Sequence, residues 1–454
     1  MVTTDLDNLT AIFKAYDVRG VVPDQLDPTL ADRVGNAFVV VTGADTVVIG
    51  HDMRASSPDL ATAFAQGAAR AGADVVLIGL CSTDELYFAS GHLAHPGAMF
   101  TASHNPARYN GIKMCRAGAQ PIGAESGLVE IRDRVAGGED QVADRPGTVS
   151  EQDVLADYAS YLLELAPVSG RRLKVAVDAG NGMAGLTAPE VLGRIEADVV
   201  PMYYELDGSF PHHEANPIEA ANLVDLQAKV REVDADVGLA FDGDADRCFL
   251  VDERGELVSP SVLTALIAAR ELRKEPGAVV IHNLITSRGV PEIVAELGGR
   301  PVRTRVGHSF IKATMAETDA IFGGEHSGHF YFRDFWRADS GMLAALHALA
   351  ALAETDQPLS EVLAPYHRHV ASGEINSEVA DQSAVLEELE RGWAGRDGVE
   401  VDHLDGLSVL HPDWWFNVRA SNTEPLLRLN AEGKDAATME RVRDEVLATI
   451  RAED

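Results

Sequence analysis

Cysteine is scarce in this chain of 454 residues. Only Cys81, Cys115 and Cys248 occur, and no two of them form a CxxC pair. Disulfide frameworks and cysteine-ligated zinc sites need more thiols at closer spacing. We therefore expect neither a disulfide-stapled domain nor a zinc centre.

Positive charge and long apolar runs are also scarce. The chain has 38 Lys and Arg against 71 Asp and Glu, a formal net charge of -33. This balance disfavours a nucleic-acid partner and provides no basic surface for anionic membranes. The first five residues lack the pattern of a signal peptide, and no apolar run reaches membrane-spanning length. We expect a cytoplasmic monomer or weak homo-oligomer.

Strand and helix patterns alternate through most of the chain. A strand over 46–50, a helix over 58–71 and a strand over 75–79 predict a βαβ unit. Similar patterns follow, with strands over 173–178 and 278–281 and helices over 152–165, 261–272, 290–297 and 341–353. The length favours several domains. We predict an α/β protein with three related α/β domains, 1–150, 151–253 and 254–366, and a linker near 358–367.

The last segment has a different pattern. Residues 414–419 and 426–430 are typical of two antiparallel strands joined by a polar turn, and the Trp414–Trp415 pair is expected in the core. A closing helix would place Met439, Val442, Val446 and Ile450 on one side. We predict a smaller α+β domain over 367–454.

Three carboxylates at alternate positions follow the apolar run 237–241. Asp242, Asp244 and Asp246 precede Arg247 and a second apolar run, a pattern that fits a strand that breaks and resumes. The side chains would repel one another without a cation, and their hard oxygen atoms favour Mg²⁺ or Ca²⁺. An EF-hand is excluded because Arg247 replaces the required Gly and the flanks are not helical. A cation beside Arg247 indicates an anionic substrate, the alternative being a solvated acidic turn.

Two further loops follow predicted strands. In 101–106, Thr-Ala-Ser-His-Asn-Pro, Ser103 is either a nucleophile or a turn former, because no GxSxG elbow surrounds it. The Gly-rich stretch 179–185 contains neither GxGxxG nor a Walker Lys-Ser/Thr pair. A tight strand-to-helix turn is favoured there over a phosphate cradle.

Two loops in the second half carry groups suited to a sugar phosphate. In 419–425, Arg419 offers a planar fork to phosphate oxygens, and Ser421, Asn422 and Thr423 add neutral donors. In 324–329, Glu325 and Ser327 can accept from and donate to neighbouring hydroxyls. An ordinary hairpin turn remains the alternative for the first loop. Binding is favoured over packing for His308 and His329, and His326 is left open.

Four of these loops, 101–106, 242–247, 324–329 and 419–425, follow one another along the chain as in the α-D-phosphohexomutases, and the sequence resembles that family from residue 16 to the C-terminus. Segments 13–20 and 307–312 are similar to the phosphomannomutase/phosphoglucomutase group. The resemblance implies domains arranged around a central cleft and a phosphoryl group on Ser103. It implies Mg²⁺ on Ser103, Asp242, Asp244 and Asp246, and catalysis by Ser103, His104, Lys113, Arg19 and Arg247. The implied substrate-binding residues are Tyr16, Arg247, Gly307, His308, Glu325, Ser327, His329, Arg419, Ser421, Asn422 and Thr423.

The implied reaction interconverts hexose 1-phosphate and hexose 6-phosphate, of mannose, glucose or both. A hexose 1,6-bisphosphate is expected as intermediate and activator, and either Lys113 or His104 could handle the proton. Phosphoglucosamine mutase is one alternative, although Asn422 and His326 replace its usual Gly and Gln. A non-catalytic sugar-phosphate-binding protein is another, which the retained Ser103 and metal carboxylates argue against.

Three positions depart from the family pattern. Ala245 replaces a Gly, which is tolerable if the backbone there has ordinary φ. Val306 stands where Thr is often found, and a Lys often placed after the third-domain strand is missing from 283–285. We hypothesise that Arg288, Arg303 or Arg305 supplies its charge.

Overall fold

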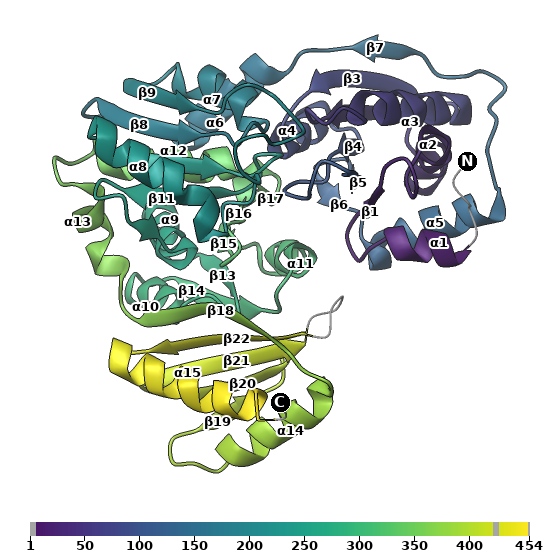
Figure 1. The fold of residues 1–454 in the computed structure, drawn as a ribbon. Helices are drawn as coiled ribbons and strands as arrows, with labels where there is room; N and C mark the ends of the chain where they lie inside the picture. Colours follow the sequence, from purple (N-terminus) through teal and green to yellow (C-terminus); the bar gives the residue numbers. More distant parts are fainter. Residues whose placement is uncertain (1–5, 421–425, 453–454) are drawn as a thin grey trace. The chain divides into compact units, whose positions relative to one another are not determined.

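The computed structural model describes residues 6–420 and 426–452, without the side chains of residues 308 and 309. The chain divides into two compact units, Met1–Pro260 with Ser327–Val362 and Ser261–His326 with Leu363–Asp454. Figure 1 shows the elements of each unit. Among the described residues, no helix is long and apolar enough to cross a membrane.

The first unit begins with a mixed sheet. Its β2 strand (Thr46–His51) is parallel to β3 (Asp74–Leu80) and β4 (Gly97–Phe100). The β5 strand (Tyr109–Arg116) is antiparallel to β4 and to β1 (Val18–Val21). The predicted βαβ unit is confirmed, since α3 (Ser57–Ala71) connects parallel β2 and β3. The strand order is β1 (Val18–Val21), β5 (Tyr109–Arg116), β4 (Gly97–Phe100), β2 (Thr46–His51), β3 (Asp74–Leu80), β7 (Val149–Glu151), with β6 (Gln120–Pro121) paired to β5.

Buried residues of the helices and the strands form one hydrophobic core in this part of the first unit. Phe38, Phe64 and Phe100 meet in this core, with Phe64 set edge-on to Phe100. Ser82 caps α4 by accepting from the backbone N–H of Glu85 at 3.2 Å. The remaining helices are α1 (Leu6–Ile12), α2 (Pro28–Thr42), α4 (Thr83–Leu93), α5 (Leu128–Gly137) and the short η1 (Ala124–Ser126).

The second sheet corrects one sequence prediction. Its β10 and β11 strands pair antiparallel, with Phe241 opposite Cys248, so the chain reverses at residues 242–247. The alternating Asp residues therefore form a hairpin loop, whereas the pattern predicted a strand that breaks and resumes. The order is β12 (Leu257–Val258), β11 (Cys248–Asp252), β10 (Val237–Phe241), β8 (Leu173–Asp178), β9 (Ala197–Met202), with helices α6 (Leu155–Leu165), α7 (Ala184–Leu192), η2 (Ala220–Leu223) and α8 (Val224–Val233).

The third segment contributes elements to both units. In the second unit, β13 (Val279–Asn283) is parallel to β14 (Arg300–Thr304) and β15 (Phe322–Gly324). In the first, β16 (Phe330–Phe332) is antiparallel to β17 (Ala338–Asp339). The expected linker near 358–367 is instead mainly helical. The helices are α9 (Pro260–Lys274), α10 (Gly289–Glu296), α11 (His308–Thr318), η3 (Arg333–Phe335), α12 (Gly341–Ala353), α13 (Leu359–Leu363) and η4 (Ala364–Tyr366).

The C-terminal segment has the predicted α+β organisation. The closing helix α15 (Ala436–Ile450) buries the four apolar side chains expected on one face, and both Trp414 and Trp415 are buried. Its antiparallel sheet has the order β18 (Val370–Glu378), β22 (Leu426–Gly433), β21 (Trp414–Ala420), β20 (Leu407–His411), β19 (Glu400–Asp402), and α14 (Gln382–Trp393) is its second helix. The α/β fold class with an α+β C-terminal domain is confirmed.

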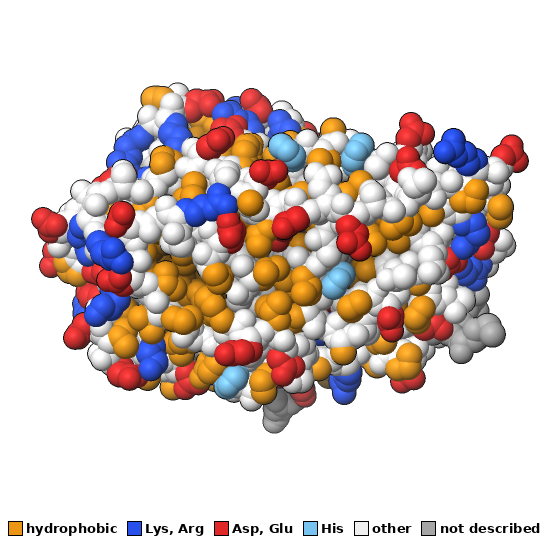
Figure 2. Space-filling model, turned by 90° about the horizontal axis from the view of Figure 1, so that it is seen from above, with side chains coloured by type: hydrophobic (Ala, Val, Ile, Leu, Met, Phe, Trp, Pro, Cys, Tyr) orange, Lys and Arg blue, Asp and Glu red, His pale blue; other side chains and the backbone are white. Residues whose placement is uncertain are grey.

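Acidic and basic side chains are interspersed with apolar ones on the face drawn in Figure 2. Among the described residues on that face, basic side chains form no continuous field. This agrees with the excess of Asp and Glu in the sequence.

Candidate active site

The first unit brings Ser103 to the loop of carboxylates. Ser103 follows β4, has a left-handed φ of 49°, and its backbone N–H donates to Thr101 Oγ1 at 2.9 Å. Its hydroxyl donates to Asp242 Oδ2 at 2.7 Å and lies 3.1 Å from His104 Nδ1. The contact joins residues 139 positions apart. Positive φ in a non-Gly residue is costly, and such strain is concentrated at functional sites.

Arg54 fixes the backbone of the Ser103 loop, a role that the sequence analysis missed. Its guanidinium donates to the carbonyls of Ser103 and Asn105 at 2.7 Å and of Pro106 and Tyr109 at 3.0 Å. Its Nε pairs with Asp52 at 3.1 Å, and the Arg54 side chain is only 1% exposed. The signal that could have found it is an Asp-x-Arg sequence directly after β2.

The carboxylates of Asp242, Asp244 and Asp246 form a site suited to a hard cation. All three are buried, and one oxygen atom of each lies within 4.8 Å of the others. Asp244 Oδ1 and Asp246 Oδ1 are buried without a hydrogen-bond partner among the described residues. Buried carboxylate oxygens need a partner. These oxygen donors therefore fit Mg²⁺.

Lys113 partly neutralises these carboxylates. Its Nζ lies 2.7 Å from Asp244 Oδ2 and 2.5 Å from Asp246 Oδ2. Burial opposes the ammonium form, but these two carboxylates hold the Lys113 pKa above its usual range. Burial likewise favours protonated Asp244, yet Lys113 lowers that pKa. Burial raises the pKa of Asp242 to about 7 despite Arg247. Lys113 is therefore a cation in this arrangement.

Two neighbouring segments contact the loop 242–247, the predicted metal loop. Thr83, at the start of α4, donates through Oγ1 to Asp244 Oδ2 at 2.6 Å and through its backbone N–H to the Asp244 carbonyl at 3.0 Å. The Met183 N–H donates to the Gly243 carbonyl at 2.9 Å. A Cβ on Gly182 would lie 2.6 Å from that same carbonyl oxygen. The Gly-rich turn 179–185 thus supports the loop by close backbone packing.

The sequence analysis expected Ala245 to be tolerated in place of Gly if its backbone had ordinary φ. The structure does not meet that condition. The φ of Ala245 is 61°, in the left-handed region, and its side chain is 1% exposed. A residue with a Cβ in that region costs about 1–2 kcal/mol relative to ordinary φ. The replacement of Gly by Ala is therefore accommodated with strain.

His104, Arg247 and Arg19 form a connected set of contacts at the Ser103 loop. Arg247 donates through Nε to Asp242 Oδ2 at 2.8 Å and through Nη2 to His104 Nδ1 at 2.6 Å. Arg19 donates to the Asn105 side chain at 2.7 Å and pairs with Asp17 at 2.6 Å. Burial, followed by the charges of Arg247 and Arg19, lowers the pKa of His104 to about 2. The imidazole is therefore neutral in this structure.

Other predicted residues of the first unit lie on nearby segments. His329 Nε2 is 3.5 Å from Asp246 Oδ1 and 3.9 Å from Asp339 Oδ2. Ser327 Oγ is 3.0 Å from His329 Nδ1. Tyr16 is half-buried and precedes β1, the strand that contains Arg19. Within the first unit, the end of the predicted sugar-binding loop 324–329 thus lies near Asp246.

The second unit contains the start of that loop. Glu325 is 2% exposed, and its Oε1 accepts from Asn283 Nδ2 and from the Gly307 N–H, each at 3.2 Å. Burial lowers the pKa of His326. Arg419 donates to Glu374 at 3.1 Å. Ser421, Asn422, Thr423 and the His308 side chain lie outside the described part of the structure.

The three Arg residues offered as substitutes for the missing Lys have different surroundings. Arg288 donates to the carbonyls of His411 and Pro412, both at 2.8 Å. Arg303 pairs with Asp402. Arg305 is exposed, and its guanidinium lies 4.7 Å from the centre of the Phe310 ring. Arg305 is therefore the most exposed of the three side chains. The hypothesis that one of them replaces the charge of the missing Lys remains a prediction.

Four family models match the chain in sequence order. All describe phosphoglucomutase/phosphomannomutase: alpha/beta/alpha domain I over residues 10–141, domain II over 156–255, domain III over 260–369 and the C-terminal domain over 374–449. Together they span most of the chain.

Curated relatives and a solved structure agree with these matches. A protein from Xanthomonas campestris pv. campestris (strain B100) named "Phosphohexose mutases" is 40% identical, covering 97% of this chain and 99% of its own length. A Pseudomonas aeruginosa phosphomannomutase/phosphoglucomutase is 36% identical, over 98% and 96%. The crystal structure of a phosphoglucomutase/phosphomannomutase family protein from Burkholderia thailandensis is 34% identical, with a TM-score of 0.89 over 100% of this chain and 98% of that one.

Proposed function

The chain belongs to the phosphoglucomutase/phosphomannomutase family of phosphotransferase isomerases, and from that premise we propose that it interconverts the 1- and 6-phosphates of mannose and glucose through a phosphoserine. The observation that supports this most directly is the 2.7 Å hydrogen bond between Ser103 Oγ and Asp242. It joins a nucleophile to a carboxylate cluster that fits Mg²⁺.

In the proposed reaction, phosphorylated Ser103 transfers its phosphoryl group to the free hydroxyl of the substrate. The P–O bond to Ser103 breaks as one to the sugar oxygen forms, which yields a hexose 1,6-bisphosphate. After the bisphosphate has turned over, the opposite phosphoryl group returns to Ser103. The same bisphosphate would recharge an enzyme that has lost its phosphate.

Charge on the moving phosphoryl group has to be balanced by the protein. Arg247, which lies against both Asp242 and His104, would hold its equatorial oxygens. Asp242, Asp244 and Asp246 would hold Mg²⁺, which supplies electrostatic stabilisation of that charge. Lys113 holds Asp244 and Asp246 in place through its two ion pairs.

We assign the proton to His104 rather than to Lys113. His104 Nδ1 lies 3.1 Å from Ser103 Oγ, whereas the Lys113 ammonium is already bound by two carboxylates. In this structure His104 Nδ1 accepts from Arg247, and burial together with the Arg247 charge lowers the His104 pKa. Once Arg247 holds the oxygens of a phosphoryl group whose negative charge offsets its own, His104 would take the proton of the substrate hydroxyl and deliver it to the serine oxygen that leaves. The number of protons is then unchanged over one transfer.

The remaining predicted residues are proposed to bind the sugar and the non-reacting phosphate. Glu325, Ser327 and His329 would contact hydroxyl groups, and Arg419 with its following turn would hold phosphate. Mannose and glucose differ at the 2-position only. A site that reads the 3- and 4-hydroxyls would accept both sugars.

The experiment that tests the proposal is phosphopeptide mapping of wild type and Ser103→Ala after incubation with Mg²⁺ and glucose 1,6-bisphosphate. We expect one phosphate on Ser103 in wild type and none in the variant. Turnover of the variant should fall at least about a thousandfold because the covalent step is lost. Binding of glucose 1-phosphate, measured by calorimetry, should persist.

Ser160→Ala on the exposed face of α6 is the matched control and should keep wild-type turnover. An unphosphorylated Ser103 in wild type, or equal turnover in Ser103→Ala, would contradict the phosphoserine mechanism. A separate assay in which mannose 1-phosphate and glucose 1-phosphate compete would define the preferred substrate. A preference for glucosamine phosphate over both would contradict the hexose assignment.

A further inference from the structure

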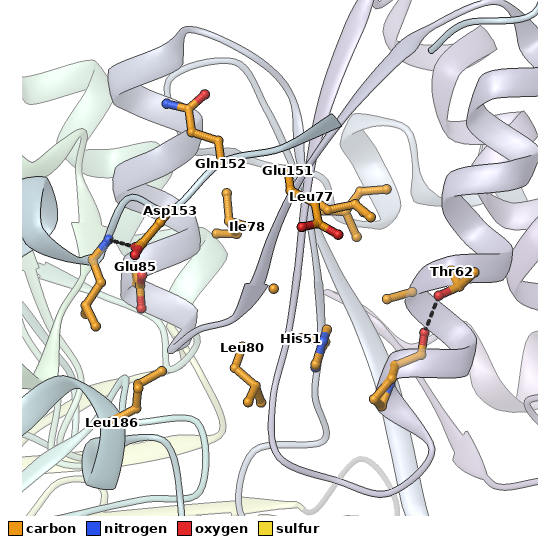
Figure 3. Close-up of a pocket in the computed structure, with 15 residues that line it drawn as sticks. His51, Thr62, Leu77, Ile78, Leu80, Glu85, Glu151, Gln152, Asp153 and Leu186 are labelled. Atoms are coloured by element: carbon orange, nitrogen blue, oxygen red, sulfur yellow. Dashed lines mark hydrogen bonds between the residues drawn. The ribbon is translucent and has the colours of Figure 1, made fainter. Parts of the chain in front are cut away.

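A cavity of about 530 Å³ lies in the first unit, and none of the residues proposed for catalysis lines it. The ends of β2 and β3, the first turn of α4 and the segment after β7 contribute its walls, together with residues of α3 and α7. Figure 3 shows its lining side chains. The volume is within the range of small-molecule sites.

Glu85 is the unusual residue of this cavity. It is 2% exposed, and its Oε2 is buried without a hydrogen-bond partner among the described residues. A buried carboxylate oxygen without a partner is costly, and natural proteins retain few of them. A ligand that donates to Glu85 from the cavity would satisfy this atom.

The charges around the cavity are of one sign. Glu151 and Asp153 also line it, and Figure 3 shows Asp153 on the same side as Glu85. No Lys or Arg is present among the described residues that line it. His51, the lining imidazole, has Nδ1 2.9 Å from the Asp52 carbonyl. The cavity therefore favours a cation.

The rest of the lining is mainly aliphatic. A metal ion is disfavoured, because the described residues include no group of three carboxylates here that could share one ion. An apolar body would instead cover a wall of hydrocarbon side chains. These side chains are Ile49, Leu77, Ile78, Leu80, Leu155 and Leu186.

We propose that this cavity binds a small organic cation, an ammonium group on an apolar body, with Glu85 as the partner of the ammonium. Burial, followed by the charges of Asp84 and Asp153, raises the pKa of Glu85 to about 8, and a bound ammonium would stabilise its carboxylate. Glu85 is two residues from Thr83, which holds Asp244. The site thus adjoins the support of the metal loop without containing its residues.

The test is calorimetric titration of the full chain with benzylamine, benzyl alcohol and benzoate as probes. Benzylamine should bind saturably with a stoichiometry of one, and at least about tenfold more tightly than either uncharged or anionic probe, a difference of about 1.4 kcal/mol. Glu85→Gln should weaken benzylamine binding at least about tenfold, because the charge-assisted hydrogen bond is lost.

Two further variants keep the outcome decisive. Leu80→Trp, at a position 42% exposed, should narrow the cavity and weaken benzylamine without disturbing the core. Glu130→Gln, an exposed acidic residue on α5, should bind benzylamine as wild type does. The proposal is overturned by absence of saturable benzylamine binding, by equal affinity for benzyl alcohol, or by undiminished binding in either Glu85→Gln or Leu80→Trp.

Discussion

A single buried guanidinium determines the geometry of the loop that carries the proposed nucleophile. Arg54 donates to four carbonyl groups between residues 103 and 109, while Asp52 balances its charge. Arg can do this because its donors lie in a rigid planar fork. A Lys at this position would keep the charge but reach fewer carbonyls.

Arg54→Lys should therefore lower kcat by about 10- to 100-fold, because small misplacement of a reacting group is costly, with a smaller change in KM. Steady-state kinetics with glucose 1-phosphate would measure this, together with the rate of Ser103 phosphorylation by the bisphosphate. Arg108→Lys is the control, since Arg108 lies over the Tyr109 ring in the same loop. Equal kcat for Arg54→Lys and wild type would refute the positioning role.

Residue-scale features divide into those visible in sequence and those visible only in three dimensions. Ser103, Asp242, Asp244 and Asp246 were singled out because each lies in a distinctive short motif, and the structure brings Ser103 to Asp242 and the three carboxylates together. Arg54 was missed because its carbonyl partners lie about fifty positions away, and the short Asp-x-Arg sequence around it does not reveal them. The left-handed φ of Ala245 was likewise invisible, since nothing in its side chain specifies a turn.

At the scale of elements, the metal loop is a hairpin supported by a glycine turn. Gly182 lies so close to Gly243 that a Cβ there would be 2.6 Å from the Gly243 carbonyl oxygen and 2.9 Å from its Cα. Backbone atoms cannot move aside as the end of a long side chain can. The turn therefore limits the position of Asp242 and Asp244 on either side of Gly243.

Gly182→Ala should displace this loop and raise the Mg²⁺ concentration needed for half-maximal activity at least about tenfold, since ligand geometry determines Mg²⁺ affinity. Calorimetric Mg²⁺ titration provides a measurement independent of turnover. Gly392→Ala is the control, because a Cβ there meets no atom within 4 Å and should leave Mg²⁺ binding unchanged. Unaltered Mg²⁺ affinity in Gly182→Ala would show that the loop yields without cost.

Elements with one buried face were the most predictable from sequence. The strand 173–178 and the helix 341–353 were predicted with the bounds that the structure shows. The reversal at 242–247 was not, because apolar runs on both sides of the carboxylates look alike whether the chain continues or turns back. Pairing with a neighbouring strand decides between these alternatives, and pairing has no local signal.

The first turn of α4 should make stability depend on pH. Burial, with Asp84 and Asp153, raises the Glu85 pKa from 4.5 to about 8, so the folded state holds a proton that the unfolded state releases above about pH 4.5. The stability that Glu85 contributes is thus complete below that pH and is lost as pH rises through 8. The difference is on the order of 3 to 5 kcal/mol.

Glu85→Gln removes this titration. The unfolding temperature of Glu85→Gln minus that of wild type should be larger at pH 8.5 than at pH 5.5. Thermal unfolding followed by circular dichroism measures both temperatures. Glu130→Gln, at an exposed position, should show no such trend. A constant difference between Glu85→Gln and wild type at both pH values would mean that Glu85 titrates normally.

On the scale of the whole molecule, net charge opposes the proposed substrate. The chain carries -33 at pH 7, and a phosphate ester carries a charge between about -1.5 and -2. Attraction from Arg19, Arg247 and Lys113 acts within the site, whereas the repulsion comes from carboxylates spread over the chain. The attraction acts over short distances and the repulsion over long ones, so salt weakens the repulsion more than the attraction.

Moderate salt should raise kcat/KM for glucose 1-phosphate. The Debye length is about 10 Å at 0.1 M ionic strength, so distant carboxylates are screened while contacts to bound phosphate persist. We expect a severalfold increase as sodium chloride rises from a few millimolar to about 0.1 M at saturating Mg²⁺. Sucrose at matched osmolality should have no such effect. A steady fall in kcat/KM from the lowest salt would instead mean that the basic side chains of the site dominate the field that the substrate meets on approach.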